Sequence, residues 1–205
     1  MGESPRAVFD AAYYRRFYRD RPVHGRAQIA KLAAGIVGLC GWWYVPVRSV
    51  LDVGAGPGFW RDWFAANRPS VRYTSIDVSE YACRRYGHRQ ADITQWHPAR
   101  PSDLVICQGV LHYLDDDAVG RALDNLAAAT RSVIYFEIPT ASDRDDVVDQ
   151  DRTDLAVHWR DGDWYRQRVD AHFVELGCGL WYSRSGPMSF YELERAPSRT
   201  DRGPL

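Results

Sequence analysis

The sequence predicts an α/β fold built on a doubly wound, seven-stranded sheet that is mostly parallel. Segments with the pattern of strands alternate with segments with the pattern of helices from residue 47 onwards. The first of these strands ends in a glycine-rich bend that leads into a helix, an arrangement that holds ligands in such sheets. The last two expected strands are too close in sequence for a helical crossover, so we expect them to form an antiparallel C-terminal hairpin.

Two helices are predicted before the sheet, over residues 8–19 and 26–40. In the second, apolar residues recur at helical spacing along one face, and Gly41 is its expected end. Residues 32–47 carry no charge, but a membrane-spanning helix needs about 20 apolar residues. We therefore expect this run to belong to a buried helix of a soluble protein, with no membrane partner.

From residue 47 onwards, the predicted elements form the sheet and the helices that cover it. Ser79 is the expected N-cap of one helix, and acidic residues occupy the first turn of another, where the helix dipole favours them. The predicted strands span residues 47–53, 71–77, 88–93, 103–108, 132–138, 179–184 and 188–195. The predicted helices among them span residues 57–68, 79–87, 115–130 and 163–177.

Length and composition predict one soluble domain. The chain has 205 residues, of which 45% are hydrophobic and 26% are charged, as in ordinary globular proteins. We expect a domain over residues 1–195, with an N-terminal helical cap over 1–45 and a core over 46–195, followed by a flexible tail over 196–205. The N-terminus lacks a signal-peptide pattern and the four cysteines are far apart, which favours a cytoplasmic protein with reduced thiols and no metal site.

The bend after the first predicted strand has the features of a ligand site. The stretch LDVGAGPG, residues 51–58, contains three alternate glycines, Gly54, Gly56 and Gly58. Such residues let the backbone turn sharply and let a ligand approach without Cβ clashes. A dinucleotide-binding turn would place its third glycine at Phe59, which disfavours a nicotinamide dehydrogenase. Asp52 would repel a diphosphate and attract a cation, so the bend predicts a positively charged nucleoside ligand.

This pattern resembles the first motif of class I S-adenosylmethionine-dependent methyltransferases, and later residues resemble the family's other motifs. Asp77 ends the second predicted strand, where the family's carboxylate binds the ribose hydroxyls, and Asp92 ends the third, near the adenine. Residues 103–117, DLVICQGVLHYLDDD, resemble the fourth-strand motif beside the methionine moiety. The resemblance spans about residues 47–195 and implies a Rossmann-like methyltransferase with S-adenosylmethionine as its cofactor. The cofactor-binding residues that it implies are Tyr14, Asp52, Gly54, Ala55, Gly56, Gly58, Asp77, Val78, Asp92, Ile93 and Gln108.

The resemblance also implies direct displacement of a methyl group from a sulfonium onto O or N of a small-molecule acceptor. In such a reaction the protein mainly positions the reactants, and a base is needed only if the acceptor must lose a proton. His112 is the candidate base and His158 a second one, although a packing role is favoured for His112. The candidate substrate-binding residues are Tyr18, Tyr113, Trp159 and Arg160. Tyr14 and Tyr18 lie four residues apart, so they share one face of the first predicted helix. There they either line the site or pack the helix onto the sheet.

Several alternatives stay open at this point. Residues 139–164 carry eight aspartates and three arginines, and form either an acidic lid that attracts an amine or a solvated, mobile loop. The net charge of −1 argues against a nucleic-acid methyltransferase, although the seven cations of residues 6–31 leave a local basic patch open. A non-catalytic, cofactor-binding partner subunit is a further alternative. The sequence does not decide the acceptor or the oligomeric state, for which a homodimer is one option.

Overall fold

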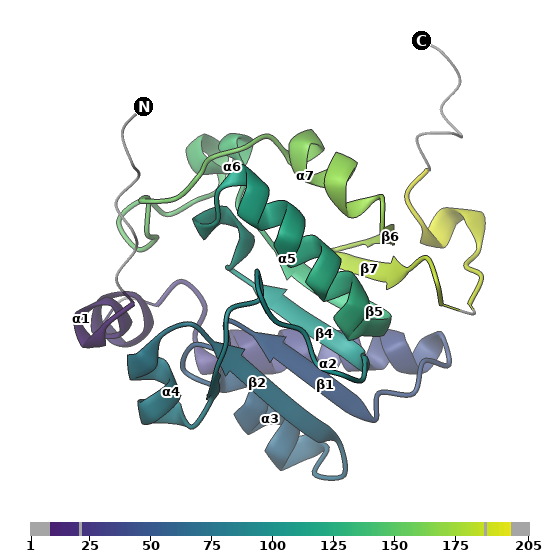
Figure 1. Ribbon diagram of the computed structural model, residues 1–205, viewed down its shortest axis with the longest axis horizontal. Helices are drawn as coiled ribbons and strands as arrows, with labels where there is room; N and C mark the ends of the chain where they lie inside the picture. The colour runs from purple at the N-terminus through teal and green to yellow at the C-terminus, as the bar shows by residue number, and fades with distance from the viewer. Residues whose placement is uncertain (1–8, 21, 187, 198–205) are drawn as a thin grey trace.

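The computed structural model describes residues 9–20, 22–186 and 188–197, and its centre is one seven-stranded sheet (Figure 1). The strands follow the order β3-β2-β1-β4-β5-β7-β6. Strands β1 to β5 are parallel, whereas β7 runs antiparallel to both β5 and β6. The strands are β1 (Ser49–Val53), β2 (Arg72–Asp77), β3 (Arg89–Gln90), β4 (Ser102–Gln108), β5 (Thr130–Glu137), β6 (Phe173–Gly177) and β7 (Leu180–Ser183). The predicted fold class is confirmed.

Helices cover both faces of this sheet (Figure 1). On one face, α2 (Arg26–Trp42) and α3 (Phe59–Asn67) pack against the sheet, and on the other α5 (Asp116–Ala129) and α7 (Gly162–Val169) do so. Residues 104–107 of β4 alternate between these two cores, which explains why this part of the strand is an unbroken apolar run. The remaining helical segments are α1 (Ala11–Tyr14), a π-helix (Arg15–Asp20), α4 (Glu80–Tyr86), α6 (Ala141–Asp146) and the 3-10 turns Leu111–Tyr113 and Glu192–Glu194.

The C-terminal hairpin exists, but its strands differ from the predicted ones. The predicted helix over residues 163–177 ends at Val169, and its last residues form β6. The predicted strand over 188–195 is wrong, because that segment is irregular and contains a 3-10 turn. A two-residue turn, Cys178 and Gly179, joins β6 to β7, and both residues have positive φ, at 52° and 77°. Such a turn matches the twist of a hairpin and fixes the pairing of the two strands.

Other boundaries differ locally from the expectations. The helix at α2 continues past Gly41 to Trp42, so Gly41 is not its end. Strand β3 is only two residues long, so Asp92 follows it in a turn and does not end a strand. The segment 139–164 is not a simple loop, because it contains α6, whose N-terminus is closed by reciprocal bonds between Thr140 and Asp143. Residues 1–8 of the expected cap and 198–205 of the expected tail lie outside the described residues.

The uncharged run 32–47 is buried on one side only. Ala33, Ile36 and Cys40 of α2 pack in the core, whereas Leu39 and Trp42 are 40% and 70% exposed. The expected helix is therefore buried along one face. Within the described part of the chain, no helix has the length and the apolar character that crossing a membrane requires.

Candidate active site

The glycine bend lies at the carboxyl end of β1, in the middle of the sheet. Gly54 and Gly56 have φ values of 68° and 54°, which side chains other than glycine's rarely allow. A Cβ atom at Gly54 would overlap the side chain of Val110, in the loop after β4. The chain segments after β1 and β4 therefore approach each other closely here. Backbone without side chains faces the space above the sheet.

Asp77, at the end of β2, faces the same bend. Its side chain is buried, and its Oδ2 accepts a hydrogen bond from the backbone N–H of Gly56 at 2.9 Å. The hydroxyl of Tyr14 approaches the same oxygen at 3.5 Å, while Oδ1 accepts the N–H of Ser79 at 2.8 Å. Because Ser79 also caps α4, the carboxylate is fixed between the bend and the next helix.

Two adjoining cavities open above these strand ends, with volumes of about 90 and 480 Å³. Of the residues predicted to bind the cofactor, the smaller cavity is lined by Tyr14, Gly54, Gly56, Asp77, Val78, Asp92 and Ile93. The larger cavity is lined by Asp52, Gly54, Ala55, Gly56 and Gln108. Gly58 lines neither cavity and is the N-cap of α3. The two cavities share walls formed by Tyr13, Tyr18, Gly54, Gly56, Gly109 and Tyr113.

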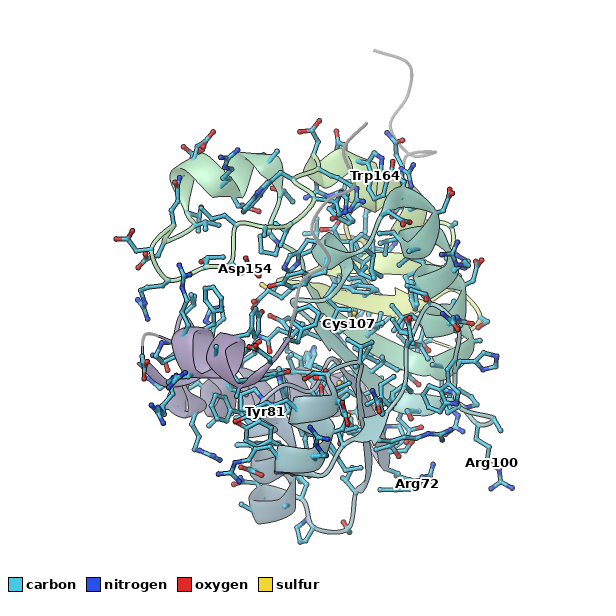
Figure 2. All side chains as sticks on the ribbon, turned by 60° about the vertical axis from the view of Figure 1, so that its left-hand side comes forward. Arg72, Tyr81, Arg100, Cys107, Asp154 and Trp164 are labelled. Atoms are coloured by element: carbon cyan, nitrogen blue, oxygen red, sulfur yellow. The ribbon has the colours of Figure 1, made fainter. Side chains whose placement is uncertain are left out.

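Aromatic residues of the first two helical segments cover both cavities. The rings of Tyr14 and Tyr18 stack with their centroids 5.3 Å apart, as expected of residues on one helix face. The hydroxyl groups of Tyr13 and Tyr113 lie 2.8 Å apart, and Tyr113 donates to Asp154 at 3.2 Å. Figure 2 shows Asp154 between the N-terminal helices and the segment that carries it. These contacts join the N-terminal helical segments to the aspartate-rich residues 139–164, which we call the acidic segment.

Asp52 is a buried acid in the floor of the larger cavity. It is 2% exposed, and its Oδ2 accepts a hydrogen bond from the hydroxyl of Tyr73 at 2.7 Å. Burial raises the pKa of Asp52 to about 7, because the charged form loses its water, although the bond from Tyr73 partly offsets this. A cation beside this carboxyl would favour its charged form.

His112 lines the larger cavity from the 3-10 turn after β4. The side chain is buried, and its Nδ1 atom has no hydrogen-bond partner. Burial lowers the pKa of His112 to about 4, so its imidazole is neutral at pH 7. The backbone carbonyl of His112 accepts the N–H of His158 at 2.8 Å, but the His158 side chain lines neither cavity.

The structure gives Arg160 and Trp159 structural partners and places neither in the cavity walls. Arg160 donates to the carbonyl of Leu114 at 2.7 Å and pairs with Asp116 at 2.8 Å. Its guanidinium also lies 4.4 Å from the ring centroid of Trp164. Arg160 thus attaches the acidic segment to α5, and the expectation that it reaches the acceptor is not supported by this geometry.

Sequence reasoning did not identify Glu137, which ends β5 and lines the larger cavity. Its carboxylate lies 3.3 Å from Nε2 of His24 and accepts a hydrogen bond from Gln108 at 3.0 Å. Gln108 in turn accepts a bond from the indole N–H of Trp60 at 2.7 Å. The available signal was its position at the end of the fifth strand, because parallel strands end at the same edge of a sheet.

Replacing Gly56 with alanine tests the backbone geometry of the bend. An alanine must adopt the left-handed conformation there, so we expect the free energy of unfolding to fall by about 1–2 kcal/mol. Gly38→Ala is the matched control, because Gly38 is exposed within α2 and nothing lies within 4 Å of its Cβ position. That control should gain about 0.5–1 kcal/mol. Urea denaturation measures both values, and equal effects of the two substitutions would contradict the assignment.

Comparison with protein families and curated proteins gives two findings. A family model described as "Methyltransferase domain" matches residues 14–180. Trans-aconitate 2-methyltransferase from Pseudomonas aeruginosa (strain UCBPP-PA14) is 26% identical over 133 residues, which cover 60% of this chain and 41% of that protein. The chain spans less than half the length of the curated relatives it matches.

Solved structures share the fold at low sequence identity. The N-methyltransferase NodS from Bradyrhizobium japonicum WM9, in complex with S-adenosyl-L-homocysteine, is 17% identical with a TM-score of 0.57, over 85% of this chain and 97% of that one. A SAM-dependent methyltransferase from Archaeoglobus fulgidus is 14% identical with a TM-score of 0.58, over 82% of this chain and 78% of that one. Both likenesses concern the fold.

Proposed function

The chain belongs to the methyltransferase-domain family, and from this premise we propose that it is an S-adenosylmethionine-dependent methyltransferase. In this proposal the methyl group goes to O or N of a small-molecule acceptor. The observation that carries the proposal is the glycine bend, which borders both adjoining cavities, together with Asp77 in the wall of the smaller one. The smaller cavity suits the nucleoside, and the larger one suits the methionine end together with the acceptor.

The residues around the smaller cavity fit a nucleoside. A carboxylate can accept bonds from two ribose hydroxyls, and Asp77 already accepts hydrogen bonds at the bend. The 3.5 Å approach of Tyr14 is the weakest of its contacts, so it is the one that a ribose hydroxyl would replace. Asp92 and Ile93, across the cavity, would border the base.

The residues around the larger cavity fit the rest of the cofactor. When bound, S-adenosylmethionine supplies a methyl group that its positive sulfur already activates. Asp52 lies in the floor, where its carboxylate favours a cation, and Gln108 offers an amide that Trp60 and Glu137 hold in place. The protein's contribution is therefore to orient both reactants and to exclude water beneath the tyrosine rings.

We propose that the imidazole of His112 accepts a hydrogen bond from the molecule that is methylated, and that it does not act as a strong base. With its pKa lowered to about 4, the neutral imidazole binds protons weakly at pH 7. Replacing His112 with phenylalanine should lower kcat/KM by about tenfold, the effect of one hydrogen bond, and leave S-adenosylhomocysteine affinity unchanged. Steady-state kinetics check this. Undiminished turnover would remove His112 from the mechanism, and a loss above about a hundredfold would indicate a general base instead.

The test of the proposed function is retention of the cofactor. The purified protein is denatured and the released molecules are identified by mass spectrometry, with S-adenosylmethionine or S-adenosylhomocysteine as the expected result. Equilibrium dialysis then measures the affinity for S-adenosylhomocysteine, with NAD as the control ligand. If neither nucleoside binds, the proposal fails. If the nucleoside binds but no acceptor is methylated, a non-catalytic partner subunit is favoured.

A further inference from the structure

The larger cavity is strongly acidic. Five carboxylic side chains line it, against the two basic side chains of His24 and Arg152 and the neutral imidazole of His112. The acidic residues are Asp52, Glu137, Asp143, Asp149 and Asp154. Both basic residues already face a carboxylate, since His24 lies 3.3 Å from Glu137 and Arg152 lies 3.5 Å from Asp149. Even with one positive charge from a bound sulfonium, the cavity keeps an excess of negative charge, which favours a cationic acceptor.

Glu137 is the carboxylate best placed to meet such an acceptor. Although burial opposes it, hydrogen bonds from His24, Gln108 and Tyr135 hold the pKa of Glu137 below its usual value, so the side chain is charged. Three donors use part of its capacity, since a carboxylate offers about four acceptor sites. The group now beside Oε1 is the basic His24, from the N-terminal region, which shows that this oxygen accommodates a basic group.

The wall of the larger cavity adds a second carboxylate and aromatic rings. Asp154, in the acidic segment, lines the cavity and accepts a hydrogen bond from the Tyr113 hydroxyl. Phe17 and Trp60 are among the aromatic residues of the wall, and aromatic faces attract cations. A neutral or anionic acceptor would gain less from these groups than an ammonium would.

We propose that the acceptor is an amine, which enters the larger cavity as an ammonium and is bound by Glu137 and Asp154. This inference rests on the proposed function. Before transfer, the ammonium releases one proton to solvent. The free nitrogen pair then forms the bond to the methyl carbon while the carbon–sulfur bond breaks, and its electrons stay on sulfur. The products are a methylated ammonium, a neutral thioether and one proton in solution.

A polycarboxylate fits this cavity poorly. Trans-aconitate, the acceptor in the name of a curated relative, carries three carboxyl groups, and each would lie among the five acids of the wall. Like charges in a partly buried cavity repel one another, and the two basic side chains are already paired. The charge of the cavity therefore predicts an acceptor that differs from trans-aconitate.

Matched probes test the sign of the acceptor's charge. The protein is saturated with S-adenosylhomocysteine and titrated with 2-phenylethylamine, 2-phenylethanol, 3-phenylpropionate and trans-aconitate, while binding is followed by ligand-observed NMR. We expect the amine to bind at least about tenfold more tightly than 3-phenylpropionate, which has a similar size and the opposite charge. Tighter binding of either carboxylate, or no binding of the amine, overturns the inference.

A pair of variants tests the role of Glu137. At saturating S-adenosylhomocysteine, Glu137→Gln should weaken amine binding by about tenfold or more. Glu175→Gln is the control, because Glu175 also pairs with a basic residue, Arg166 at 3.3 Å, but lies on β6 outside the cavity. Unchanged amine affinity in Glu137→Gln overturns the assignment. If S-adenosylhomocysteine does not bind the wild-type protein, the proposed function itself fails. The wild-type probe series decides the inference even if a variant does not fold.

Discussion

Replacing Asp77 with asparagine is expected to weaken S-adenosylhomocysteine binding at least about a hundredfold. Two ribose hydroxyls would lose a charged acceptor, and hydrogen bonds to charged groups are each worth about 1.5–3 kcal/mol. Every 1.4 kcal/mol is about tenfold in affinity, so the sum exceeds a hundredfold. The asparagine oxygen can still accept the N–H of Gly56, which keeps the bend in place. Equilibrium dialysis measures the affinity.

The control for this prediction is Asp124→Asn. Asp124 lies on α5, its side chain is 73% exposed, and it lines neither cavity. This variant should bind the nucleoside like the wild type. Thermal unfolding of both variants checks that the fold survives. Retention of wild-type affinity by folded Asp77→Asn would remove Asp77 from the ribose site.

Replacing Asp52 with asparagine is expected to stabilise the fold at pH 8 by about 2–4 kcal/mol. Burial raises the pKa of Asp52 from 3.8 to about 7 in the folded protein, so the fold favours the neutral acid. The contribution of neutral Asp52 to the free energy of unfolding is complete below pH 3.8 and declines as the pH rises toward 7, because Asp52 ionises first in the unfolded chain. Each pKa unit corresponds to about 1.4 kcal/mol. An asparagine cannot ionise and still accepts the Tyr73 hydroxyl, so it avoids this loss.

The stabilisation should therefore depend on pH. Urea denaturation at pH 4, 6 and 8 should show almost no difference between Asp52→Asn and wild type at pH 4 and the full difference at pH 8. The same variant should bind S-adenosylmethionine about tenfold more weakly, with a smaller loss for S-adenosylhomocysteine, whose sulfur is neutral. If the stability difference between Asp52→Asn and wild type is no larger at pH 8 than at pH 4, the assignment of Asp52 as a buried acid is contradicted.

The sequence predicted the parts of the site that depend on local chain geometry. Gly54 and Gly56 must be glycine because of their own φ values, and Asp77 ends a strand whose neighbours end at the same edge. Both features can be read from a few adjacent residues. The role of Glu137 could not be read in this way, because its partner His24 comes from a distant segment.

The errors in prediction have similarly physical causes. Helical spacing supports α7 only as far as Val169, and the following Phe173–Gly177 also fits a strand, so the two-residue turn after it decides the outcome. Positive φ at Cys178, which is not glycine, gave no signal in the sequence. Arg160 has the chemistry of a substrate ligand, but Leu114 and Asp116 occupy its donors. Tertiary contacts of this kind determine which polar residues remain available to a ligand.

The hydrogen bonds that the protein makes to Asp77 affect the thermodynamics of ligand binding. Because Gly56, Ser79 and Tyr14 already surround the carboxylate, a ribose hydroxyl that replaces Tyr14 exchanges a hydrogen bond from the protein for one from the ligand. Such an exchange yields little net enthalpy. Apolar contact under the stacked rings of Tyr14 and Tyr18 then adds to the driving force, and its signature is a negative change in heat capacity on association.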